Sequence, residues 1–566
     1  MKNLLSDFKP QLFISLKSYS KEKFAKDVMA GTIVGIVALP LAIAFGISSG
    51  VSPEVGIYTA IIGGFIVAFL GGCTVQIGGP TGAFIIIVAN IIQQFEIKGL
   101  IIATILAGIM LILMGALKLG TVIKFVPFPI IVGFTSGIAL TIFSTQIKDF
   151  FGLQIGDVPS DFIEKWKFYF QNFDSVNWWT FGIGIMSILT IVFSSKLLRK
   201  IPGSLIAIIL ITAVVYLLRN FAGIEGIETI GDRFSINTDL PHVDNSISLN
   251  IESIKLLFPS AFTIAMLCAI ESLLSAKVAD GVTGEKTNSN TELIAQGAAN
   301  IVVPLFGGIP VTGAIARTMT NINNGGRTPV AGIVHAAVLL LIVLFLGDLT
   351  KHIPMSCLAG VLVVVSYNMS EWRTFKSLLK GAKSDVAVLV TTFILTVIFD
   401  LTIAIEIGLV LAIFLFLRRI TETTKISVVR DEVKMEDENE FAAHSNEKLV
   451  LPKGVEVYEI DGPFFFGIAN KFDESMRVIG EKATVRIIRM RKVPFVDSTA
   501  LHNLESLCLK AQNEGITIIL SGVRQSVRET LEKAGFIELL GTENICSHIN
   551  IALERAGEIL RKATAE

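Results

Sequence analysis

Long apolar segments recur along most of this sequence and constrain its fold more than any other feature. Of the 566 residues, 52% are hydrophobic and only 17% are charged, whereas soluble globular proteins carry about 25% charged residues. A helix needs roughly 20 apolar residues to cross a bilayer. The apolar segments lie near residues 29–48, 55–71, 81–95, 99–117, 127–147, 179–195, 203–219, 259–279, 292–306, 312–322, 329–347, 354–368, 385–400 and 402–417. A soluble protein would have to bury all of them, so the sequence predicts a polytopic α-helical membrane protein with fourteen segments.

Lysine and arginine residues are unevenly divided between the predicted loops. They gather in alternate loops and directly after the last segment, whereas the short loops on the other side hold little beyond Lys98 and Lys351. Positive residues mark the cytoplasmic side of a membrane. We therefore expect a multi-pass protein of the cell's inner (cytoplasmic) membrane with both termini in the cytoplasm. Two longer external segments are expected at 148–177 and 220–258.

The composition divides the chain into four parts. We expect a cytoplasmic N-terminal segment over residues 1–28, a transmembrane domain over 29–420, a charged linker with some strand over 421–450 and a soluble domain over 451–566. In the soluble domain, the strand-like runs GVEVYEID, ATVRIIRM and ITIILSG alternate with the helix-like runs STALHNLESLCLKAQNEG and RQSVRETLEKAG. That alternation predicts a small α/β domain with helices covering a sheet.

The sequence lacks the usual signals of an enzyme. The five cysteines are scattered, and they form neither a zinc motif nor a disulfide framework. We find no nucleophile–base pair, metal cluster or nucleotide-binding loop, and the net charge of −1 points to no particular partner. We expect no enzyme activity, no cofactor, no metal and no nucleic-acid partner.

A cluster of helix-breaking residues interrupts the third apolar segment and recurs in the tenth. Residues 78–84 read GGPTGAF, and residues 307–317 read GGIPVTGAIAR. The halves 29–219 and 259–417 hold seven segments each, and a breaker cluster opens the third segment of each half. Because seven is odd, the second half is inverted relative to the first. Interrupted helices at matching positions of inverted repeats indicate a secondary transporter with a midplane substrate site.

The residue types in the two clusters suit an anion site. Pro80 and Pro310 fit the first turn of a helix, where a missing N–H costs nothing, and the flanking glycines permit unwound backbone. Two half-helices would then begin near the midplane, with their free N–H groups and positive dipole ends converging on one point. Thr81 and Thr312 can add hydroxyl donors. The alternative is that glycine and proline merely kink the helices.

Two charged residues lie within the predicted spans. Glu271 is in the middle of AMLCAIESLLSAKVAD, and Arg317 follows Pro310 in the tenth segment. Charged residues at such depth are costly and usually functional. Arg317 would attract an anion, and Glu271 can exchange a proton and so couple anion entry to proton entry; Ser275 lies one turn further on the same face. The alternative is a static salt bridge.

Several motifs are specific when they are taken together: ALPLAIAFGISSG, QIGGPTGAF, AIESLLSAKVAD, IAQGAANIVVPLFGGIPVTGAIART and GGRTPVAG. They resemble motifs of the sulfate permease (SulP) family of anion transporters, and the C-terminal domain resembles its STAS domain. The resemblance covers nearly the whole chain. It implies a seven-plus-seven inverted-repeat fold like that of uracil permeases, in which a core domain moves against a gate domain in elevator fashion. It also implies a homodimer.

The resemblance bears on coupling. Proton-coupled plant sulfate transporters of the family have glutamate and arginine at the positions of Glu271 and Arg317. Sodium-dependent cyanobacterial bicarbonate transporters have aspartate and threonine at the positions of Glu271 and Ser275, and a hydroxyl where this chain has Ile315. The missing hydroxyl and the added arginine argue against sodium coupling. Many members have Pro-Gln-x-x-x-Tyr in the first span, whereas this chain has Pro40, Leu41 and Phe45, which leaves the substrate preference open.

These arguments define a predicted site between segments three and ten. Its substrate-binding residues are Phe45, Thr81, Gly82, Ala83, Thr312, Gly313, Ala314, Ile315 and Arg317. Proton coupling is assigned to Glu271. The supporting residues are Pro40, Ser275, Pro80 and Pro310.

The STAS-like part contains VDSTAL at residues 496–501, which resembles the loop-to-helix motif of bacterial STAS proteins. Thr499 falls at the phosphorylatable position of the stand-alone regulators, next to Ser498. Asp497 or Ser498 would cap the helix in any case, and we prefer that interpretation. The domain is expected to assist assembly, dimer contact or regulation by a cytoplasmic partner.

The predicted function is secondary active transport of a small inorganic anion across the lipid bilayer, with sulfate and protons taken up together. Bicarbonate or dicarboxylate uptake stays open as an alternative. So does a membrane anion sensor that signals through its STAS domain.

Overall fold

The computed structural model describes residues 8–121, 127–156, 158–159, 161–197, 202–221, 226–234, 251–399, 401–429, 432–434, 448–468 and 483–565. The chain divides into two compact units, Met1–Ala412 and Ile413–Glu566. Each unit has a hydrophobic core of its own.

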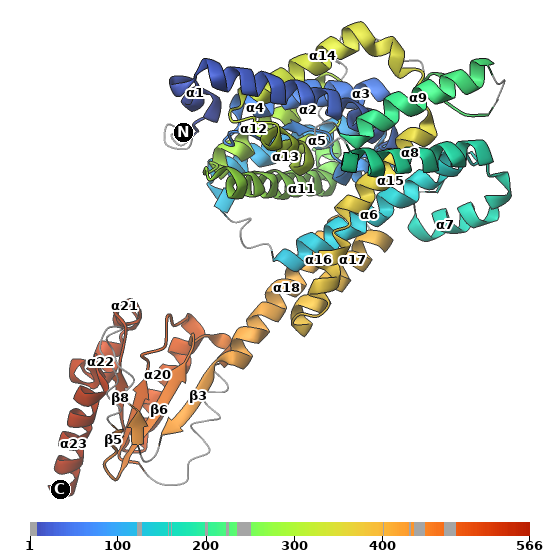
Figure 1. The fold of residues 1–566 in the computed structure, drawn as a ribbon. Coiled ribbons are helices and arrows are strands. Elements are labelled where there is room, and N and C mark those ends of the chain that lie inside the picture. Colours follow the sequence, from blue (N-terminus) through green and yellow to red (C-terminus); the bar gives the residue numbers. More distant parts are fainter. Residues whose placement is uncertain are drawn as a thin grey trace. The chain divides into compact units, whose positions relative to one another are not determined.

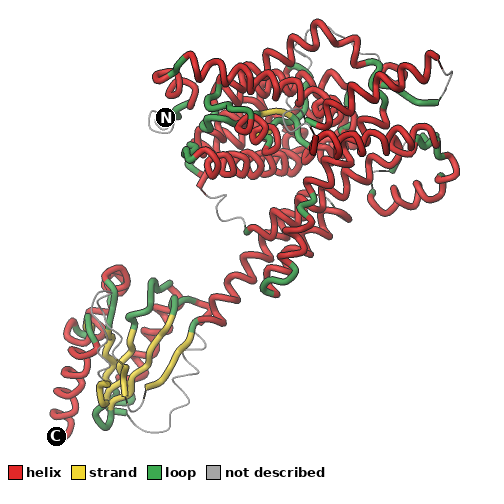
Figure 2. The backbone as a smooth tube through the Cα atoms, in the orientation of Figure 1, coloured by secondary structure: helices red, strands yellow, loops and turns green. Residues whose placement is uncertain are grey.

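Helices occupy all fourteen predicted apolar segments (Figures 1 and 2). Those of the first half are α2 (Lys21–Ser48), α3 (Pro53–Tyr58) continued through a π-helical turn (Thr59–Gly63) into α4 (Gly64–Leu70), a 3-10 turn (Gly82–Phe84) leading into α5 (Ile85–Ala116), α6 (Phe128–Phe151), α8 (Trp178–Leu197) and α9 (Gly203–Phe221). Those of the second half are α11 (Ile251–Thr283), α12 (Ser289–Leu305), α13 (Ile315–Asn323), α14 (Val330–Thr350), α15 (Met355–Met369), α17 (Lys383–Ile398) and α18 (Leu401–Thr423). Shorter helices are α1 (Gln11–Ser15), α7 (Phe162–Gln171), α10 (Ile230–Arg233) and α16 (Trp372–Leu378).

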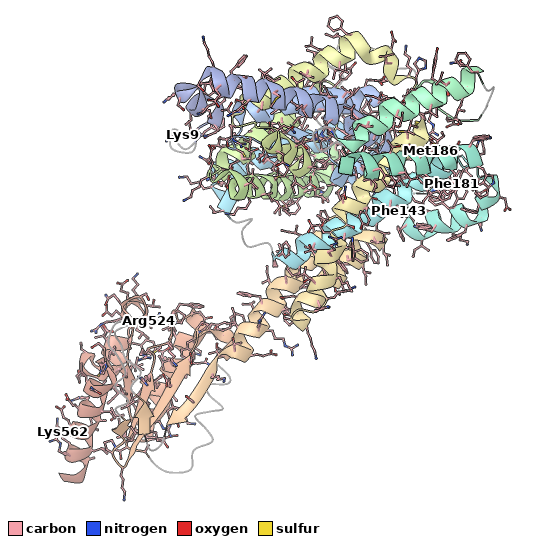
Figure 3. All side chains as sticks on the ribbon, viewed as in Figure 1. Lys9, Phe143, Phe181, Met186, Arg524 and Lys562 are labelled. Atoms are coloured by element: carbon pink, nitrogen blue, oxygen red, sulfur yellow. The ribbon has the colours of Figure 1, made fainter. Side chains whose placement is uncertain are left out.

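Six helical stretches within the described ranges are long and apolar enough to cross a membrane. The predicted third and fourth segments join in α5, which kinks at Glu96, where φ is 58°. Apolar side chains also cover the outside of this unit. Met186, for example, projects from α8 and is 44% exposed (Figure 3). An apolar outer surface over long apolar helices is the pattern of a membrane protein.

Helix packing follows the inverted relation between the two halves. α2 packs on α14, and the equivalent pair α11 and α5 also pack together. α6 packs on α15, which holds the equivalent place in the second half. The contact of α6 with α17 is matched by that of α15 with α8. We call α2–α5 and α11–α14 the core helices, and α6, α8, α9, α15 and α17 the gate helices.

Small residues allow the core helices to approach closely. α5 packs along α12, and Gly108 and Gly297 face each other at this contact. A Cβ atom at Gly108 would lie 2.7 Å from the carbonyl oxygen of Gly297, and one at Gly297 would lie 2.5 Å from that of Gly108. Such small-residue contacts are typical of helix packing in membranes. They fix α12 against the helix that follows the first breaker cluster.

The segment 226–234 is attached to the connection between α14 and α15. Ile230 N donates to Ile353 O over 2.9 Å, and Met355 N donates to Glu228 O over 2.9 Å. This segment, which we call the outer clasp, thus joins the point where the chain passes from a core helix to a gate helix.

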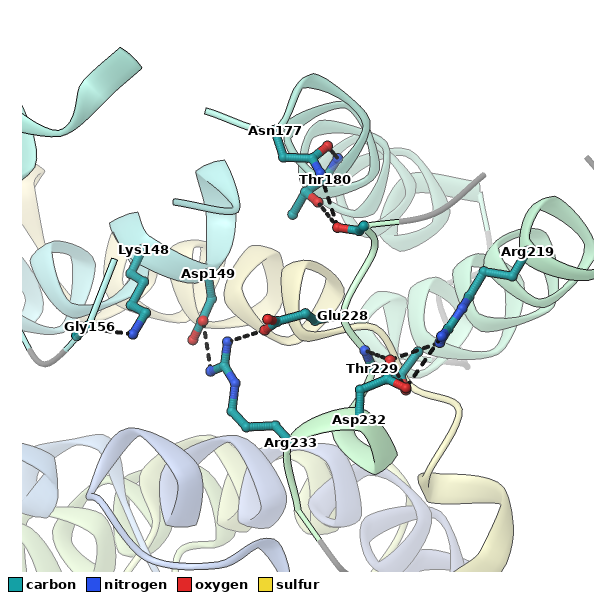
Figure 4. Close-up of polar contacts among 11 residues, drawn as sticks. Lys148, Asp149, Gly156, Asn177, Thr180, Arg219, Glu228, Thr229, Asp232 and Arg233 are labelled. Carbon is teal, nitrogen blue, oxygen red and sulfur yellow. Dashed lines mark hydrogen bonds and ion pairs between the residues drawn. The ribbon is translucent and has the colours of Figure 1, made fainter. Parts of the chain in front are cut away.

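Ion pairs connect the outer clasp to two gate helices (Figure 4). Arg233 lies 2.9 Å from Asp149 of α6 and 2.5 Å from Glu228. Arg219 of α9 lies 2.8 Å from Asp232. Burial opposes ionisation of Asp232, but hydrogen bonds from Arg219 and Thr229 hold the pKa of its carboxyl below the ordinary value.

The second unit is a five-stranded sheet with helices on both faces. The strand order is β3 (Lys425–Val429), β6 (Val455–Asp461), β7 (Val485–Arg489), β8 (Thr517–Ser521), β9 (Ile545–Cys546), and all pairs are parallel except β3 with β6. One apolar cluster joins the sheet to α20 (Ser498–Asn513), α21 (Gln525–Lys533) and α22 (Phe536–Leu540), and another joins it to α23 (Ile549–Ala565). The predicted strands and helices of this domain are therefore confirmed.

The expected linker over residues 421–450 contains strands. It holds the edge strand β3 and the antiparallel pair β4 (Glu432–Lys434) and β5 (Lys448–Val450). Residues 430–431 and 435–447 of this segment lie outside the described residues.

Candidate functional site

The two breaker clusters meet as a short antiparallel strand pair. β1 (Gly78–Gly79) pairs with β2 (Thr312–Gly313), so that Gly78 lies opposite Gly313 and Gly79 opposite Thr312. A helical segment begins shortly after each strand, the 3-10 turn at Gly82 and α13 at Ile315. The two predicted halves of the site, more than 200 residues apart in sequence, are thus brought together with a helix N-terminus leaving each of them.

Charged side chains from the second half hold the first breaker cluster. Glu271 of α11 accepts a hydrogen bond from the Thr81 hydroxyl, with 2.9 Å between Oγ1 and Oε2. Arg317 of α13 donates from Nη2 to the carbonyl oxygen of Pro80. No ion pair within 4.0 Å joins Glu271 to Arg317 in the described part of the chain. The static salt bridge that the sequence left open is therefore not formed. Glu271 binds Thr81 instead, and Arg317 binds the carbonyl oxygen of Pro80.

Gly79 makes room for the Arg317 guanidinium. Its φ is +152°, a conformation that favours glycine, and a Cβ atom there would lie 3.1 Å from Cζ of Arg317. Any side chain at this position would therefore displace the guanidinium that holds Pro80.

Arg317 keeps one donor without a partner. Its side chain is only 3% exposed, and Nη1 has no hydrogen-bond partner among the described residues. An unpaired guanidinium N–H in a buried place costs free energy, so such a group marks a place for a ligand. Since a guanidinium is always charged, the ligand that would suit this donor is an anion.

An apolar wall faces the other side of the first cluster. A Cβ atom at Gly82 would lie 3.0 Å from Ile142 Cδ1 of α6, 3.3 Å from Met369 Sδ of α15 and 3.5 Å from Phe45 Cε1 of α2. Ala83, next to it, is fully buried. Phe45 belongs to a core helix, whereas Ile142 and Met369 belong to gate helices, so the site lies where the two groups touch.

In the second cluster, Thr312 and the amide of Gly313 are held by neutral groups of their own half. The Thr312 hydroxyl donates to Cys268 O over 3.1 Å and lies 2.8 Å from the Ser272 hydroxyl. Gly313 N donates to Ser272 Oγ over 3.1 Å. The structure therefore differs from the expectation that Thr312 offers a free hydroxyl to an anion, because protein groups already bind it.

The other predicted residues of the second half lie before and after Thr312 and Gly313 in the chain or on the neighbouring helix α11. Ala314 N donates to Ile77 O over 2.9 Å, and Pro310 is buried. Ile315 is 37% exposed at the start of α13. Ser275 donates to Thr318 Oγ1 over 3.3 Å and so supports the helix that carries Arg317.

Pro40 is a residue of α2. It is buried inside α2, which continues as a helix from Lys21 to Ser48. It also lines an apolar groove between α2, α9 and α14.

Sequence reasoning missed a buried carboxylate that anchors the unwound segment before the first cluster. Glu292 of α12 is fully buried and accepts from Gly72 N (2.8 Å) and Cys73 N (3.1 Å). It also accepts from the side chains of Gln76 (2.9 Å) and Gln296 (2.8 Å). The only signal in the sequence was an acidic residue at the start of an apolar helix, which is equally typical of a solvated first turn.

Family comparisons agree with this geometry. The sulfate permease family model matches residues 24–392, and the STAS domain model matches residues 448–552. The chain belongs to the sulfate permease family. This confirms the predicted family and fold class, a multi-pass helical membrane protein with a STAS domain, and places the chain among transporters rather than enzymes.

Sulfate permease relatives match the chain over most of its length. A Bacillus subtilis protein named "Putative sulfate transporter YvdB" is 39% identical over 94% of this chain and 98% of its own length. The "Bicarbonate transporter BicA" of Picosynechococcus sp. is 29% identical over 90% of each chain. The solved structure of the murine Solute Carrier 26 family member A9 anion transporter has a TM-score of 0.86 over 99% of this chain and 95% of that chain, with 18% identity, and so shares the fold.

In the STAS domain, Asp497 is the helix cap. It accepts from Ala500 N over 2.8 Å through one carboxylate oxygen and from Phe466 N over 3.0 Å through the other. Of the two predicted capping residues, Asp497 rather than Ser498 therefore caps the helix. Ser498 and Thr499 are both exposed at the start of α20.

Proposed function

We propose that the chain takes up sulfate together with protons as a secondary active transporter. The observation that carries the proposal is the buried, unpaired Nη1 donor of Arg317 beside the β1–β2 pair. The positive ends of two helices add to its potential, and a dianion needs such concentrated positive charge in a poorly hydrated place. The name of the Bacillus relative supports sulfate as the anion.

The proposed anion site lies between Arg317, Thr81 and the start of the two half-helices. Backbone N–H groups near Gly82, Ala83 and Ile315 would complete the donors. Phe45 would close the apolar side, where it packs near Gly82. A site with few water molecules strengthens each of these interactions.

Proton coupling would act through the Thr81 hydroxyl. While Glu271 is ionised, Thr81 must donate its proton to the carboxylate, as in the 2.9 Å contact. A protonated Glu271 can instead donate to Thr81 Oγ1, which frees the Thr81 O–H for the anion. The same proton removes a negative charge that would repel sulfate. The anion and the proton would therefore favour each other's binding.

Movement of the core helices against the gate helices would expose the site to each side in turn. The closeness of Gly82 to Ile142 and Met369, which a Cβ atom there would meet at 3.0 Å and 3.3 Å, supports a site at that boundary. Inverted-repeat transporters with a midplane site typically use such rigid-body motion. We further propose that the protein is a homodimer of the inner membrane with both termini in the cytoplasm. Residues 29–420 would form the transport domain. The STAS domain over residues 451–566 would bind a cytoplasmic regulator.

Bicarbonate uptake is the second candidate function, because the bicarbonate transporter BicA is 29% identical to this chain. Glu271 and Arg317 favour sulfate and protons over bicarbonate and sodium. Sodium prefers several oxygen ligands, whereas the structure offers a guanidinium at this place.

Uptake by the reconstituted full-length protein separates these functions. Proteoliposomes would receive labelled sulfate, bicarbonate or fumarate under an imposed proton gradient or an imposed sodium gradient. We expect sulfate to accumulate with the proton gradient alone. Accumulation of bicarbonate driven by sodium would contradict the proposal, and sulfate binding without flux would favour a sensor.

A further inference from the structure

An apolar groove of about 930 Å³ lies between two core helices and one gate helix. Its apolar lining includes Leu39 and Ile43 of α2, Ile208 and Leu217 of α9, and Val338 and Ile342 of α14. Ile209 and Leu217 on its α9 wall are 63% and 54% exposed. In a bilayer, a groove of this kind is open to lipid chains rather than to water.

A polar pocket of about 680 Å³ continues the groove at the external ends of α9 and α14. The two cavities share Tyr216 and His352, whose rings make an edge-to-face contact at 5.6 Å. The polar pocket adds Arg219, Lys351 and Asp232. The side chains of Arg219 and Lys351 are 40% and 42% exposed, so both cations can be reached by a ligand.

We propose that the groove and the pocket together bind one anionic glycerophospholipid. An acyl chain would fill the groove between α2, α9 and α14, and the phosphate would bind at Lys351, Arg219 and His352. Two basic side chains line the pocket, and each is paired with a carboxylate: Arg219 with Asp232 (2.8 Å) and Lys351 with Asp348 (2.6 Å), whose side chain is 84% exposed and lies outside the pocket lining. A phosphate at the pocket would therefore share these cations with the carboxylates or displace them. Basic pockets between membrane helices suit anionic headgroups, and aromatic rings such as Tyr216 suit the boundary between chains and headgroups.

Simpler ligands would occupy only one of the two cavities. Free phosphate would make no contact with the apolar groove, and a hydrocarbon without a charged group would make no ion pair in the polar pocket. Because the groove walls come from both core and gate helices, a bound chain would bridge the two groups. The site is separate from Arg317 and Glu271, so its test is independent of the proposed transport function.

Native mass spectrometry of the full-length protein tests the proposal. The protein would be released from nanodiscs that contain equal amounts of phosphatidylglycerol and phosphatidylcholine, and the retained lipids would be counted. We expect retained phosphatidylglycerol, reduced about tenfold or more by Lys351→Glu and abolished by Ala213→Trp, which fills the groove. Lys98→Glu and Ala337→Trp make the same changes at exposed positions outside both cavities, and they should retain the lipid.

Photo-crosslinking of the wild-type protein gives a readout that does not depend on variants. Phosphatidylglycerol with a diazirine in its acyl chain should label peptides of α2, α9 or α14, and unlabelled phosphatidylglycerol should compete better than phosphatidylcholine. Labelling confined to other helices, equal competition by both lipids, or competition by inorganic phosphate alone would overturn the proposal. So would equal lipid loss in the groove variants and their controls.

Discussion

The two breaker clusters have similar sequences but different supports. The first, around Pro80 and Thr81, is held by the charged side chains of Arg317 and Glu271, which come from the other half of the chain. The second, around Thr312, is held by Ser272 and the Cys268 carbonyl within its own half. The difference teaches that the inverted repeat brings the two clusters together as a strand pair, whereas the charged groups that hold them come from one half alone.

The largest effect in this comparison is expected at Glu292, which anchors the segment before the first cluster. Glu292→Ala leaves buried amide donors of Gly72 and Cys73 unpaired, at a cost of about 3 kcal/mol or more in the free energy of unfolding. Ser272→Ala, at the second cluster, should cost about 1 kcal/mol. Thermal unfolding in detergent measures both. Equal losses would mean that the two clusters are supported alike.

Gly79→Ala should have the next largest effect. The substitution combines a φ of +152° with displacement of Arg317, so we expect about 1–3 kcal/mol of destabilisation and loss of sulfate uptake. Gly50→Ala is a matched control, because Gly50 has a φ of +84° with no atoms near its Cβ position. Gly50→Ala should be strained but keep its uptake; if both variants transport equally, the contact of Gly79 with Arg317 has no role in transport.

The paired substitutions Thr81→Val and Thr312→Val sharpen the comparison further, since valine keeps the shape and removes the hydroxyl. Thr81→Val should weaken the pH dependence of sulfate uptake without abolishing it, because Glu271 loses its hydrogen-bond link to the anion but its charge still repels sulfate. Thr312→Val should lower stability by about 1 kcal/mol and leave the pH dependence unchanged. Initial rates of sulfate uptake, measured across a range of external pH, test both expectations. If Thr312→Val changes the pH dependence and Thr81→Val does not, the proposed roles of the two hydroxyls are wrong.

The smallest effect is expected at the outer clasp. The pKa of Asp232 is lowered, so its pair with Arg219 contributes stability above the ordinary pKa of aspartate and loses it as the pH falls through the lowered value. Both side chains are 40% exposed, so the contribution is below about 1 kcal/mol. Asp232→Asn should flatten the acid dependence of the melting temperature slightly, and Glu22→Gln should flatten it less, because its pair with Lys26 on α2 is exposed and screened by solvent.

Much of the fold was predictable because it depends on local patterns. Apolar length located the helices, and the repeated glycine–proline clusters located the strand pair that joins the halves. The partners of individual groups were not predictable in the same way. That Arg317 binds the Pro80 carbonyl, that the Thr312 hydroxyl is already bound, and that Glu292 holds the amides of Gly72 and Cys73 all depend on packing between distant segments.

The central claim, that Glu271 couples proton entry to anion entry, is tested most directly by sulfate accumulation in proteoliposomes with an imposed proton gradient. Glu271→Gln keeps the size of the side chain and its ability to bind Thr81, but it cannot exchange a proton. We predict that this variant exchanges sulfate across the membrane without accumulating it against a gradient. Accumulation at the wild-type level, with unchanged dependence on pH, would contradict the account.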